Sequence, residues 1–301
     1  MRLTELLPSR VDLREVGPRD GLQIEAPLPT EDKLHLLQAL LQTGVRRIEA
    51  TAFVSPKAVP SMADAEAIAE FTQDYPDVDW SALVASPNGA RRAVAAGMRT
   101  LEYVVSAADG HSQANVHRPT QQALAEVESV AQIVQDGGGR CEVIIATAWD
   151  CPFDGPTPPE RTVSIATRAA ELGADQLCLG DTIGTTSPAR VTSLVEAVRD
   201  AVPHLPLGAH FHNTRGQGIA NAYAALLAGV TQLDASVGGM GGCPFAPGAS
   251  GNIASEELVY LLDDAGIESG IDLDAMLSAA ALAQGLVGHP LASQLLKAGG
   301  R

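Results

Sequence analysis

Two histidines separated by a single residue, His210 and His212, are the sharpest chemical signal in the sequence. They end a short apolar run, Leu207–His212, that is typical of a β-strand. Side chains two positions apart on a strand point to the same face, so both imidazoles can share one metal ion. The pattern also fits a pair of buried, hydrogen-bonded histidines. Asp20 and Asn252, in segments that follow other strand-like runs, favour the metal site.

These four side chains form a donor set of nitrogen and oxygen atoms without a thiol. Such a set favours Mg²⁺ or Mn²⁺ over a structural zinc site, and it is also compatible with Zn²⁺ and Co²⁺. Four protein ligands would leave positions open on an octahedral ion. A substrate hydroxyl and an adjacent carboxylate or carbonyl group could fill those positions.

Three more polar positions near predicted strand ends have both a catalytic and a structural interpretation. Arg19 could stabilise a developing enolate or carboxylate, or form an ordinary salt bridge with a neighbouring carboxylate. Cys243 has four glycines just before it in its loop; it could act as an acid or base if its neighbours lower its pKa, or be an inert thiol. Asp181, in LGDTIGTTSP, could be catalytic or cap a helix, and Thr182 and Thr185 fit the capping interpretation equally well.

The elements that must position these residues alternate along the chain, with short apolar and β-branched runs between longer Ala- and Leu-rich segments. Such alternation predicts parallel strands joined by crossover helices, in the α/β class. Eight runs indicate a closed (β/α)8 TIM barrel. An open doubly wound sheet usually has a Gly-rich phosphate loop after its first strand, where this chain has VGPRDG. The predicted strands are Val11–Val16, Arg47–Ala50, Trp80–Ala85, Thr100–Ser106, Cys141–Thr147, Gln176–Gly180, Leu207–His212 and Gln232–Ser236. The predicted helices include Thr30–Thr43, Met62–Phe71, Gln121–Asp136, Pro158–Leu172, Pro188–Ala201 and Gly218–Ala228.

The 301 residues are expected to form a single domain, because a barrel of this kind takes about 250 residues and no second core is visible. The part from about 253 to 301 is predicted as a C-terminal helical extension packed on the barrel. Its helices are Ser255–Asp264, Leu273–Leu286 and Leu291–Lys297.

In such barrels the active site lies at the carboxyl ends of the strands. Arg19 and Asp20 follow the first predicted strand, Glu49 stands near the end of the second, and Asp181 follows the sixth. The histidine pair ends the seventh strand, and a Gly-rich loop follows the eighth. The sequence therefore predicts one site that collects these side chains at the barrel mouth.

The formal net charge of −16 argues against nucleic acid as a partner, since an acidic surface repels phosphate backbones. An anionic substrate would need a local basic patch. Four cysteines without a C-x-x-C pair or zinc spacing indicate free thiols in a reducing compartment. No leader or membrane-length apolar run is visible, so a cytoplasmic protein without membrane contact is expected. The candidate basic patches are Arg46–Arg47, Arg91–Arg92 with Arg99, and His117–Arg118.

Taken together, these segments resemble the 3-hydroxy-3-methylglutaryl-CoA lyase family. The resemblance spans nearly the whole chain, from EVGPRDGLQ at 15–23 to SGNIASEELVYLLDDAGI at 250–267, and GGCPFAPGASGN is its most specific segment. It implies a (β/α)8 barrel, a divalent cation, usually Mg²⁺ or Mn²⁺, and an acyl-CoA substrate. By analogy it also implies a homodimer or higher homo-oligomer. The implied metal ligands are Asp20, His210, His212 and Asn252.

The chemistry that the resemblance implies is cleavage of a carbon–carbon bond. The metal binds the C3 hydroxyl and the distal carboxylate, and His210 or Asp20 removes the hydroxyl proton. Arg19 then stabilises the enolate of acetyl-CoA, and Cys243 or a water returns a proton to carbon. From 3-hydroxy-3-methylglutaryl-CoA the products would be acetoacetate and acetyl-CoA. The other catalytic or substrate-binding positions that the resemblance implies are Glu49, Asp181, Gln23 and Thr182.

The sequence departs from the family at four places. Asn213-Thr214-Arg215 stands where Asp-Thr-Tyr is usual, Ile24 replaces an asparagine, Ala26 replaces a lysine, and residues 108–118 differ along their length. These changes predict altered acyl or CoA recognition, with a related 3-hydroxy-3-alkylglutaryl-CoA or a citramalyl-type thioester as substrate.

Two other functions stay open at this point. One is an acetyl-CoA-dependent synthase of the isopropylmalate or homocitrate type, which shares the H-x-H-N run; PRDGLQ and the loop cysteine argue against it. The other is a non-catalytic metal- or acyl-CoA-binding barrel. The presence of every predicted ligand and catalytic-type residue argues against that one.

Overall fold

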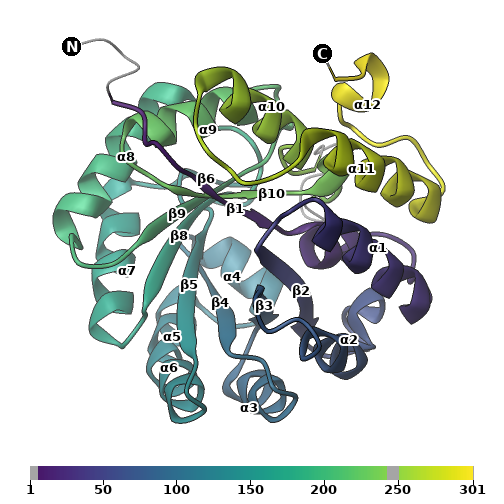
Figure 1. Ribbon diagram of the computed structural model, residues 1–301. Coiled ribbons are helices and arrows are strands. Elements are labelled where there is room, and N and C mark those ends of the chain that lie inside the picture. Colours follow the sequence, from purple (N-terminus) through teal and green to yellow (C-terminus); the bar gives the residue numbers. More distant parts are fainter. Residues whose placement is uncertain (1–5, 243–250, 301) are drawn as a thin grey trace.

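Eight parallel strands close into a barrel in the computed structural model, which describes residues 6–242 and 251–300 (Figure 1). The strands follow chain order around the ring, and pairing of the first with the last, Asp12 opposite Gln232, closes it. The predicted TIM barrel is confirmed. The barrel strands are β1 (Asp12–Glu15), β2 (Arg47–Phe53), β3 (Asp79–Val84), β4 (Thr100–Ser106), β5 (Arg140–Ala146), β8 (Gln176–Asp181), β9 (Leu207–Phe211) and β10 (Gln232–Ala235).

Each predicted strand has a counterpart in the barrel, with ends that differ by at most three residues and, for Thr100–Ser106, coincide. The largest difference is at β2, which was predicted to end at Ala50 and continues to Phe53. Its pairing with β3 shifts register between Glu49 and Thr51. A bulge of this kind lengthens and re-aims a strand in a way that local composition does not indicate.

The helices form an outer ring around the strands (Figure 1). No helix in the described ranges combines the length and the apolar character that crossing a membrane requires. The helices are α1 (Thr30–Gln42), α2 (Ala65–Thr72), α3 (Pro87–Ala95), α4 (Asp109–Val116), α5 (Thr120–Ala125), α6 (Val127–Asp136), α7 (Pro159–Glu171), α8 (Pro188–Ala201), α9 (Gly218–Leu227), α10 (Ser255–Ala265), α11 (Leu273–Val287) and α12 (Leu295–Ala298). Short turns of 3-10 or π type are η2 (Gly17–Gly21), η3 (Pro60–Met62) and η4 (Val237–Gly239), and a small hairpin pairs β6 (Asp150–Cys151) with β7 (Gly155–Pro156).

Two helices, α3 and α4, are not among the predicted helices named above by their ranges. The first turn of α3 contains Asn88-Gly89, a dipeptide that is typical of turns. The helix begins there because Ser86 accepts a hydrogen bond from the Gly89 N–H at 3.2 Å. Pro87 also fits the first helical position. Helix α4 is mostly polar, and it ends at Val116, before His117, whose φ is +56°. A segment without an apolar stripe gives no periodic signal of a helix.

Helix α10 takes the place of the eighth crossover helix, since it follows β10 and lies next to the strands in Figure 1. Helix α11 then packs against α1 and α10. The prediction grouped these two helices with α12 as one extension. The structure shows that α10 and α11 together fill the ring between β10 and α1, while α12 lies beyond α11.

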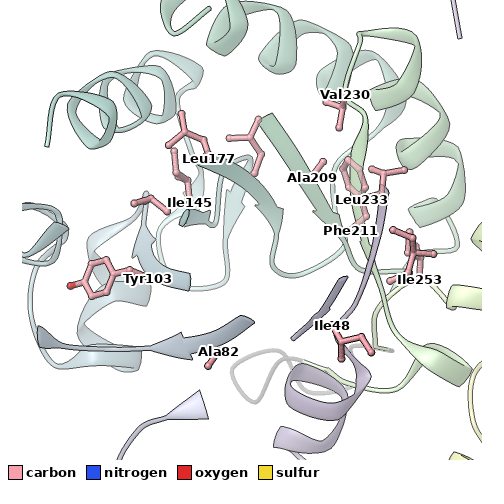
Figure 2. Packing of buried hydrophobic residues seen from close by; sticks show 14 of the residues in the cluster. Ile48, Ala82, Tyr103, Ile145, Leu177, Ala209, Phe211, Val230, Leu233 and Ile253 are labelled. Carbon is pink, nitrogen blue, oxygen red and sulfur yellow. The ribbon is translucent and has the colours of Figure 1, made fainter. Parts of the chain in front are cut away.

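The side chains of each strand divide between two environments because successive residues point to opposite faces. Those facing outward form one apolar cluster with the helices, in which Ile48, Tyr103, Leu177 and Phe211 can be seen in Figure 2. Those facing inward include buried charges. Arg14 on β1 contacts Glu142 on β5, which lies across the ring, so their ion pair passes through the barrel interior.

Candidate metal centre and active site

The two predicted histidines and Asp20 meet at the carboxyl ends of the strands. One potential ligand atom from each lies within 4.8 Å of the other two. Asp20 belongs to η2, directly after β1, while His210 is on β9 and His212 follows its last residue. The imidazole rings are 5.1 Å apart between centroids. Phe211, between the histidines, points to the opposite face and packs against Trp149, which fixes the direction of both imidazoles.

Asn252 joins this group through the backbone and the side chain. It forms a β-bridge with His212, and its Nδ2 donates to Asp20 Oδ2 at 2.7 Å and to the Met240 carbonyl at 3.0 Å. Its buried Oδ1 has no hydrogen-bond partner in the described part of the chain. A buried amide oxygen without a donor is uncommon in proteins, and it is a ligand type that Mg²⁺ and Mn²⁺ accept. The residues present therefore fit a divalent cation.

Gly241 allows the last loop to approach two of these side chains. Its φ is +112°, and a Cβ there would lie 2.6 Å from Asn252 Nδ2 and 3.3 Å from Asp20 Oδ2. Any side chain at this position would displace Asn252 or Asp20. The glycine is therefore a condition for the geometry of the site.

The protonation states of Asp20 and His212 suit metal binding, which requires ionised carboxylate and neutral imidazole. Burial raises the pKa of Asp20, but the charge of Arg19 and the two imidazoles outweigh it, and the pKa lies below its ordinary value. Burial and the neighbouring His210 lower the pKa of His212 to about 4. For His210, burial lowers the pKa, while the hydrogen bond and charge of Asp234 outweigh burial and raise it.

Arg19 lies beside the triad, with its side chain almost fully buried. Its Nε donates to Glu49 Oε1 at 2.5 Å, and its Nη1 donates to Asp20 Oδ1 at 2.8 Å and Gln23 Oε1 at 3.3 Å. Burial lowers the pKa of Arg19, but the two carboxylates outweigh it and raise the pKa above its ordinary value, so the guanidinium stays charged. The salt-bridge interpretation thus holds, and Arg19 also lines the cavity next to the triad.

Glu49 itself has no exposed surface and does not line that cavity. Burial raises its pKa, against the opposing effect of Arg19, and its Oε2 accepts no hydrogen bond from a described residue. The structure therefore places Glu49 behind Arg19, as its ion-pair partner.

Asp181 is buried at the end of β8 and holds the loop that leads to α8. It accepts backbone hydrogen bonds from Thr185 at 3.1 Å and Thr186 at 3.3 Å, but it does not cap the helix, which begins seven positions later. Burial raises its pKa to about 6. Thr182 does line the cavity, and its hydroxyl accepts a hydrogen bond from the Thr147 N–H at 2.7 Å.

The cavity beside the triad has a volume of about 550 Å³. Such a volume suits a small ligand or part of a larger one. Polar groups of the triad and Arg19 lie on its wall together with apolar side chains from several strands. The wall includes Arg19, Asp20, Gln23, Phe53, Arg92, Val104, His111, His117, Arg118, Ile144, Thr182, His210 and His212.

Two of the three predicted basic patches contribute to the cavity wall. Arg92 lies over the Phe53 ring at 5.6 Å and pairs with Glu66, and Arg118 pairs with Glu126. Arg47, from the remaining patch, lies at the start of β2 and pairs with Asp79, so it faces the opposite end of the barrel. The cavity thus has cationic side chains within a chain whose net charge is −16.

Two buried residues at the site were not predicted. Asp234 contacts His210, with 3.1 Å between Oδ2 and Nδ1. His111 lines the cavity, and its Nδ1 is 2.6 Å from Ser106 Oγ; burial lowers its pKa to about 4. The alternation Leu233-Asp234, apolar then charged within a strand, was a signal for the first. Cys243, predicted as an acid or base, lies outside the described residues, so its role stays a prediction.

The fold and this site together define a barrel enzyme with a candidate metal centre at the carboxyl ends of its strands. The chain belongs to the HMGL-like family, whose model matches residues 10–283. It is similar to the (R)-citramalyl-CoA lyase of Chloroflexus aurantiacus, with 40% identity over 96% of this chain and 95% of the relative. It is similar to the hydroxymethylglutaryl-CoA lyase YngG of Bacillus subtilis, with 37% identity over 96% and 97%.

Solved structures agree with these relatives. An HMG-CoA lyase from Acinetobacter baumannii in complex with coenzyme A and 3-methylmalate superposes with a TM-score of 0.92, at 39% identity, over 97% of this chain and 95% of that chain. The hydroxymethylglutaryl-CoA lyase of Pseudomonas aeruginosa gives a TM-score of 0.93 at 36% identity, over 97% and 98%. The chain is therefore a lyase of the HMG-CoA lyase type, which removes the non-catalytic interpretation.

Proposed function

We propose that the protein is a divalent-metal-dependent carbon–carbon lyase that cleaves 3-hydroxy-3-methylglutaryl-CoA, or a close 3-hydroxy-3-alkylglutaryl-CoA, to acetyl-CoA and acetoacetate or the corresponding 3-oxo acid. The observation that carries the proposal is the convergence of Asp20, His210 and His212 beside Arg19 on one cavity wall. The Chloroflexus and Bacillus relatives act on thioesters of this class.

Asp20, His210, His212 and Asn252 would hold Mg²⁺ or Mn²⁺. When bound, the cation would lower the pKa of the substrate's C3 hydroxyl. We assign acceptance of the hydroxyl proton to His210 or Asp20. A His210 Nε2 atom that binds the cation has no lone pair left for a proton, and Nδ1 faces Asp234, so His210 could accept the proton only while it is not a ligand. Asp20 has two carboxylate oxygens and is the alternative acceptor.

Arg19 would stabilise the negative charge that develops on the thioester oxygen as the C2–C3 bond breaks. Its pairing with Glu49 and Asp20 fixes the guanidinium before the substrate arrives, and a preorganised donor is most effective in such a buried site. Gln23 and Thr182 are proposed to orient the acyl group, since both line the cavity. Asp181 is proposed to support Thr182, its chain neighbour.

Of the four departures from the family, the stretch at 108–118 contributes to the cavity wall. Ile24, Ala26 and Arg215 do not line the cavity; Ile24 is 46% exposed, and Arg215 donates to the Ile183 and Gly184 carbonyls. Residues 108–118 do contribute to the wall, through His111 and Arg118 among others. A changed substrate preference would therefore arise from residues 108–118, in and just after α4.

(R)-Citramalyl-CoA is the second candidate substrate, because a citramalyl-CoA lyase is a 40% identical relative over almost the full chain. This thioester lacks one methylene between the hydroxyl carbon and the distal carboxylate, and its ketone product is pyruvate rather than acetoacetate. One methylene in a pocket changes specificity by about 1–3 kcal/mol, so the two lyase reactions are close alternatives. Both the Chloroflexus and the Bacillus relative are lyases, which argues against the condensing reaction.

The experiment is mass spectrometry of the products that purified protein forms from each thioester with Mg²⁺ or Mn²⁺. Acetoacetate and acetyl-CoA from 3-hydroxy-3-methylglutaryl-CoA, at a higher kcat/KM than pyruvate from (R)-citramalyl-CoA, support the proposal. A higher kcat/KM for the citramalyl thioester would mean that (R)-citramalyl-CoA is the preferred substrate. The proposal is contradicted if the protein cleaves neither of these two thioesters nor a thioester with a longer C3 chain.

A further inference from the structure

Asp234 lies on β10 in register with His210 on the neighbouring strand β9. Its Oδ2 is 3.1 Å from the Nδ1 atom of that imidazole, and both side chains are largely buried. We propose that Asp234 is a positioning residue that holds His210 with Nε2 aimed at the metal site. This inference rests on the proposed metal site and adds a residue to it from outside the ligand set.

Asp234 can do this because Arg14 fixes its carboxylate. Arg14 Nε is 2.9 Å from Asp234 Oδ1, and Arg14 Nη2 is 2.8 Å from Oδ2, which is a two-pronged ion pair of the strongest geometry. The carboxylate cannot rotate without losing one of these bonds. Both oxygens of this ion only accept, so the bond to His210 requires the proton on Nδ1. The unshared pair of His210 then lies on Nε2, as ligation through that atom requires.

The guanidinium is itself held across the barrel. It donates to both oxygens of Glu142 on β5, at 2.8 and 3.0 Å, and pairs with Glu102 on β4 at 2.8 Å. These contacts join three strands to β10. The orientation of His210 is thus set by the barrel itself and does not depend on the loops at its mouth.

The two histidines differ in this respect. Among the described residues, Asp20 is the carboxylate that pairs with His212, at 4.0 Å, and Asp20 is a predicted ligand of the same ion. His210 has a carboxylate that belongs to no other part of the site. A carboxylate on the far nitrogen of a metal-binding imidazole typically raises metal affinity 10- to 100-fold. Asp234 is therefore expected to affect metal binding before it affects any step of the reaction.

The test measures Mn²⁺ binding to chelator-stripped full-length protein by electron paramagnetic resonance of the free ion. Asp234→Asn keeps the size of the side chain but removes the two-pronged pair and permits the other tautomer of His210; the Mn²⁺ dissociation constant should rise about 10- to 100-fold. Glu142→Gln is the matched control, since Glu142 is also buried and contacts the same arginine but not His210, and glutamine keeps an oxygen that can accept from Arg14. Its dissociation constant should stay within about twofold of the unaltered protein, because the His210–Asp234 bond is retained.

Equal binding by both variants and the unaltered protein overturns the role of Asp234, and so does an equal loss in both variants. Failure of the unaltered protein to bind Mn²⁺ overturns the metal site together with this role. A second measurement needs no variant at Asp234. Long-range ¹⁵N NMR of the histidine rings in metal-free protein, with His210 assigned by comparison with His210→Asn, should show the proton on Nδ1. A proton on Nε2 alone would refute the positioning role even if Asp234→Asn does not fold.

Discussion

Arg14 on β1 and Arg19 in the turn after it are both buried, but they serve two different purposes. Arg14 lies inside the barrel, with Nε, Nη1 and Nη2 all engaged by carboxylates. Arg19 lies at the mouth, with Nε and Nη1 engaged, while no hydrogen bond from its Nη2 connects it to the described residues. Arg19 also lines the cavity, and Arg14 does not.

This difference indicates which buried charged residues are candidates for a functional role. A guanidinium whose donors are all used within the protein supports structure, whereas one that keeps a donor toward a cavity can bind a ligand. Both are paired, because an unpaired buried charge is strongly destabilising. Pairing alone therefore does not distinguish the two roles, and the remaining donor does.

The largest effect is expected at Arg14. Arg14→Met leaves Glu102, Glu142 and Asp234 buried without their shared cation, and breaking such a group typically costs about 3–5 kcal/mol of unfolding free energy. Urea denaturation followed by circular dichroism measures it. Arg92→Met is the control, because its ion pair with Glu66 is solvent-exposed and contributes at most about 1 kcal/mol. Equal losses of unfolding free energy in the two variants would contradict the structural role assigned to Arg14.

Arg19→Lys should act on the reaction more than on stability. Lysine keeps the charge but not the planar fork, so the Nη2 donor that no described residue uses is lost, and kcat should fall about 10²- to 10³-fold, as when one oxyanion donor is removed. Steady-state kinetics at saturating Mn²⁺ tests this. Arg47→Lys, at the other end of the barrel, should keep kcat within about twofold, since Arg47 does not line the cavity. Undiminished kcat in Arg19→Lys would remove Arg19 from the mechanism.

Glu15 lies between the two arginines in sequence but is held by neutral donors. The Gly17 and Val237 N–H groups donate to its Oε1 at 2.8 Å, and Ser255 Oγ donates to its Oε2 at 2.5 Å. Burial raises its pKa from 4.5 to about 7, with the hydrogen bonds opposing that rise. Because the folded pKa is the higher one, this contribution to stability is complete below pH 4.5 and is lost as pH rises through 7.

Glu15→Gln should therefore gain stability relative to the unaltered protein as pH rises. The amide can accept both N–H bonds and donate to the serine, so the difference between pH 5 and pH 8 should reach about 2 kcal/mol. Urea denaturation of both proteins at the two pH values measures it. A difference that does not change with pH would mean that Glu15 is ionised throughout, with a folded pKa near its ordinary value.

Gly241→Ala gives the smallest expected effect. The added Cβ would press on Asn252 and Asp20, so Mn²⁺ binding should weaken about fivefold, which corresponds to ~1 kcal/mol. Gly266→Ala controls for backbone strain, because Gly266 also has a positive φ, +71°, but a Cβ there meets no atom within 4 Å. Equal Mn²⁺ affinity in the two variants would show that the loop does not touch the ligand set.

Much of the barrel was predictable because its strands are buried on both faces and its helices have apolar stripes. All eight strands follow from composition alone. The register shift that extends β2 to Phe53 does not, since it depends on pairing with β3. The polar helix α4 could not be predicted from composition either, because the residues that it buries, such as His111 and Ser112, become buried only once the chain has folded.

The candidate site shows the same division. His210, His212 and Asp20 were predictable because each ends or follows a strand, and the carboxyl ends of barrel strands meet. Asp234 was missed because a single charge inside a short strand gives no indication of its partner. That partner, Arg14, lies some 220 positions away, and the pair forms only when the last strand closes on the first.

One measurement tests the central claim most directly. Chelator-stripped protein is titrated with Mn²⁺ while bound ion and acetyl-CoA release from 3-hydroxy-3-methylglutaryl-CoA or (R)-citramalyl-CoA are followed together. The account predicts no release without the ion, and a rate that rises in parallel with occupancy and levels off at one Mn²⁺ per chain. Full activity in stripped protein, or a rate that does not follow occupancy of that one site, would contradict it.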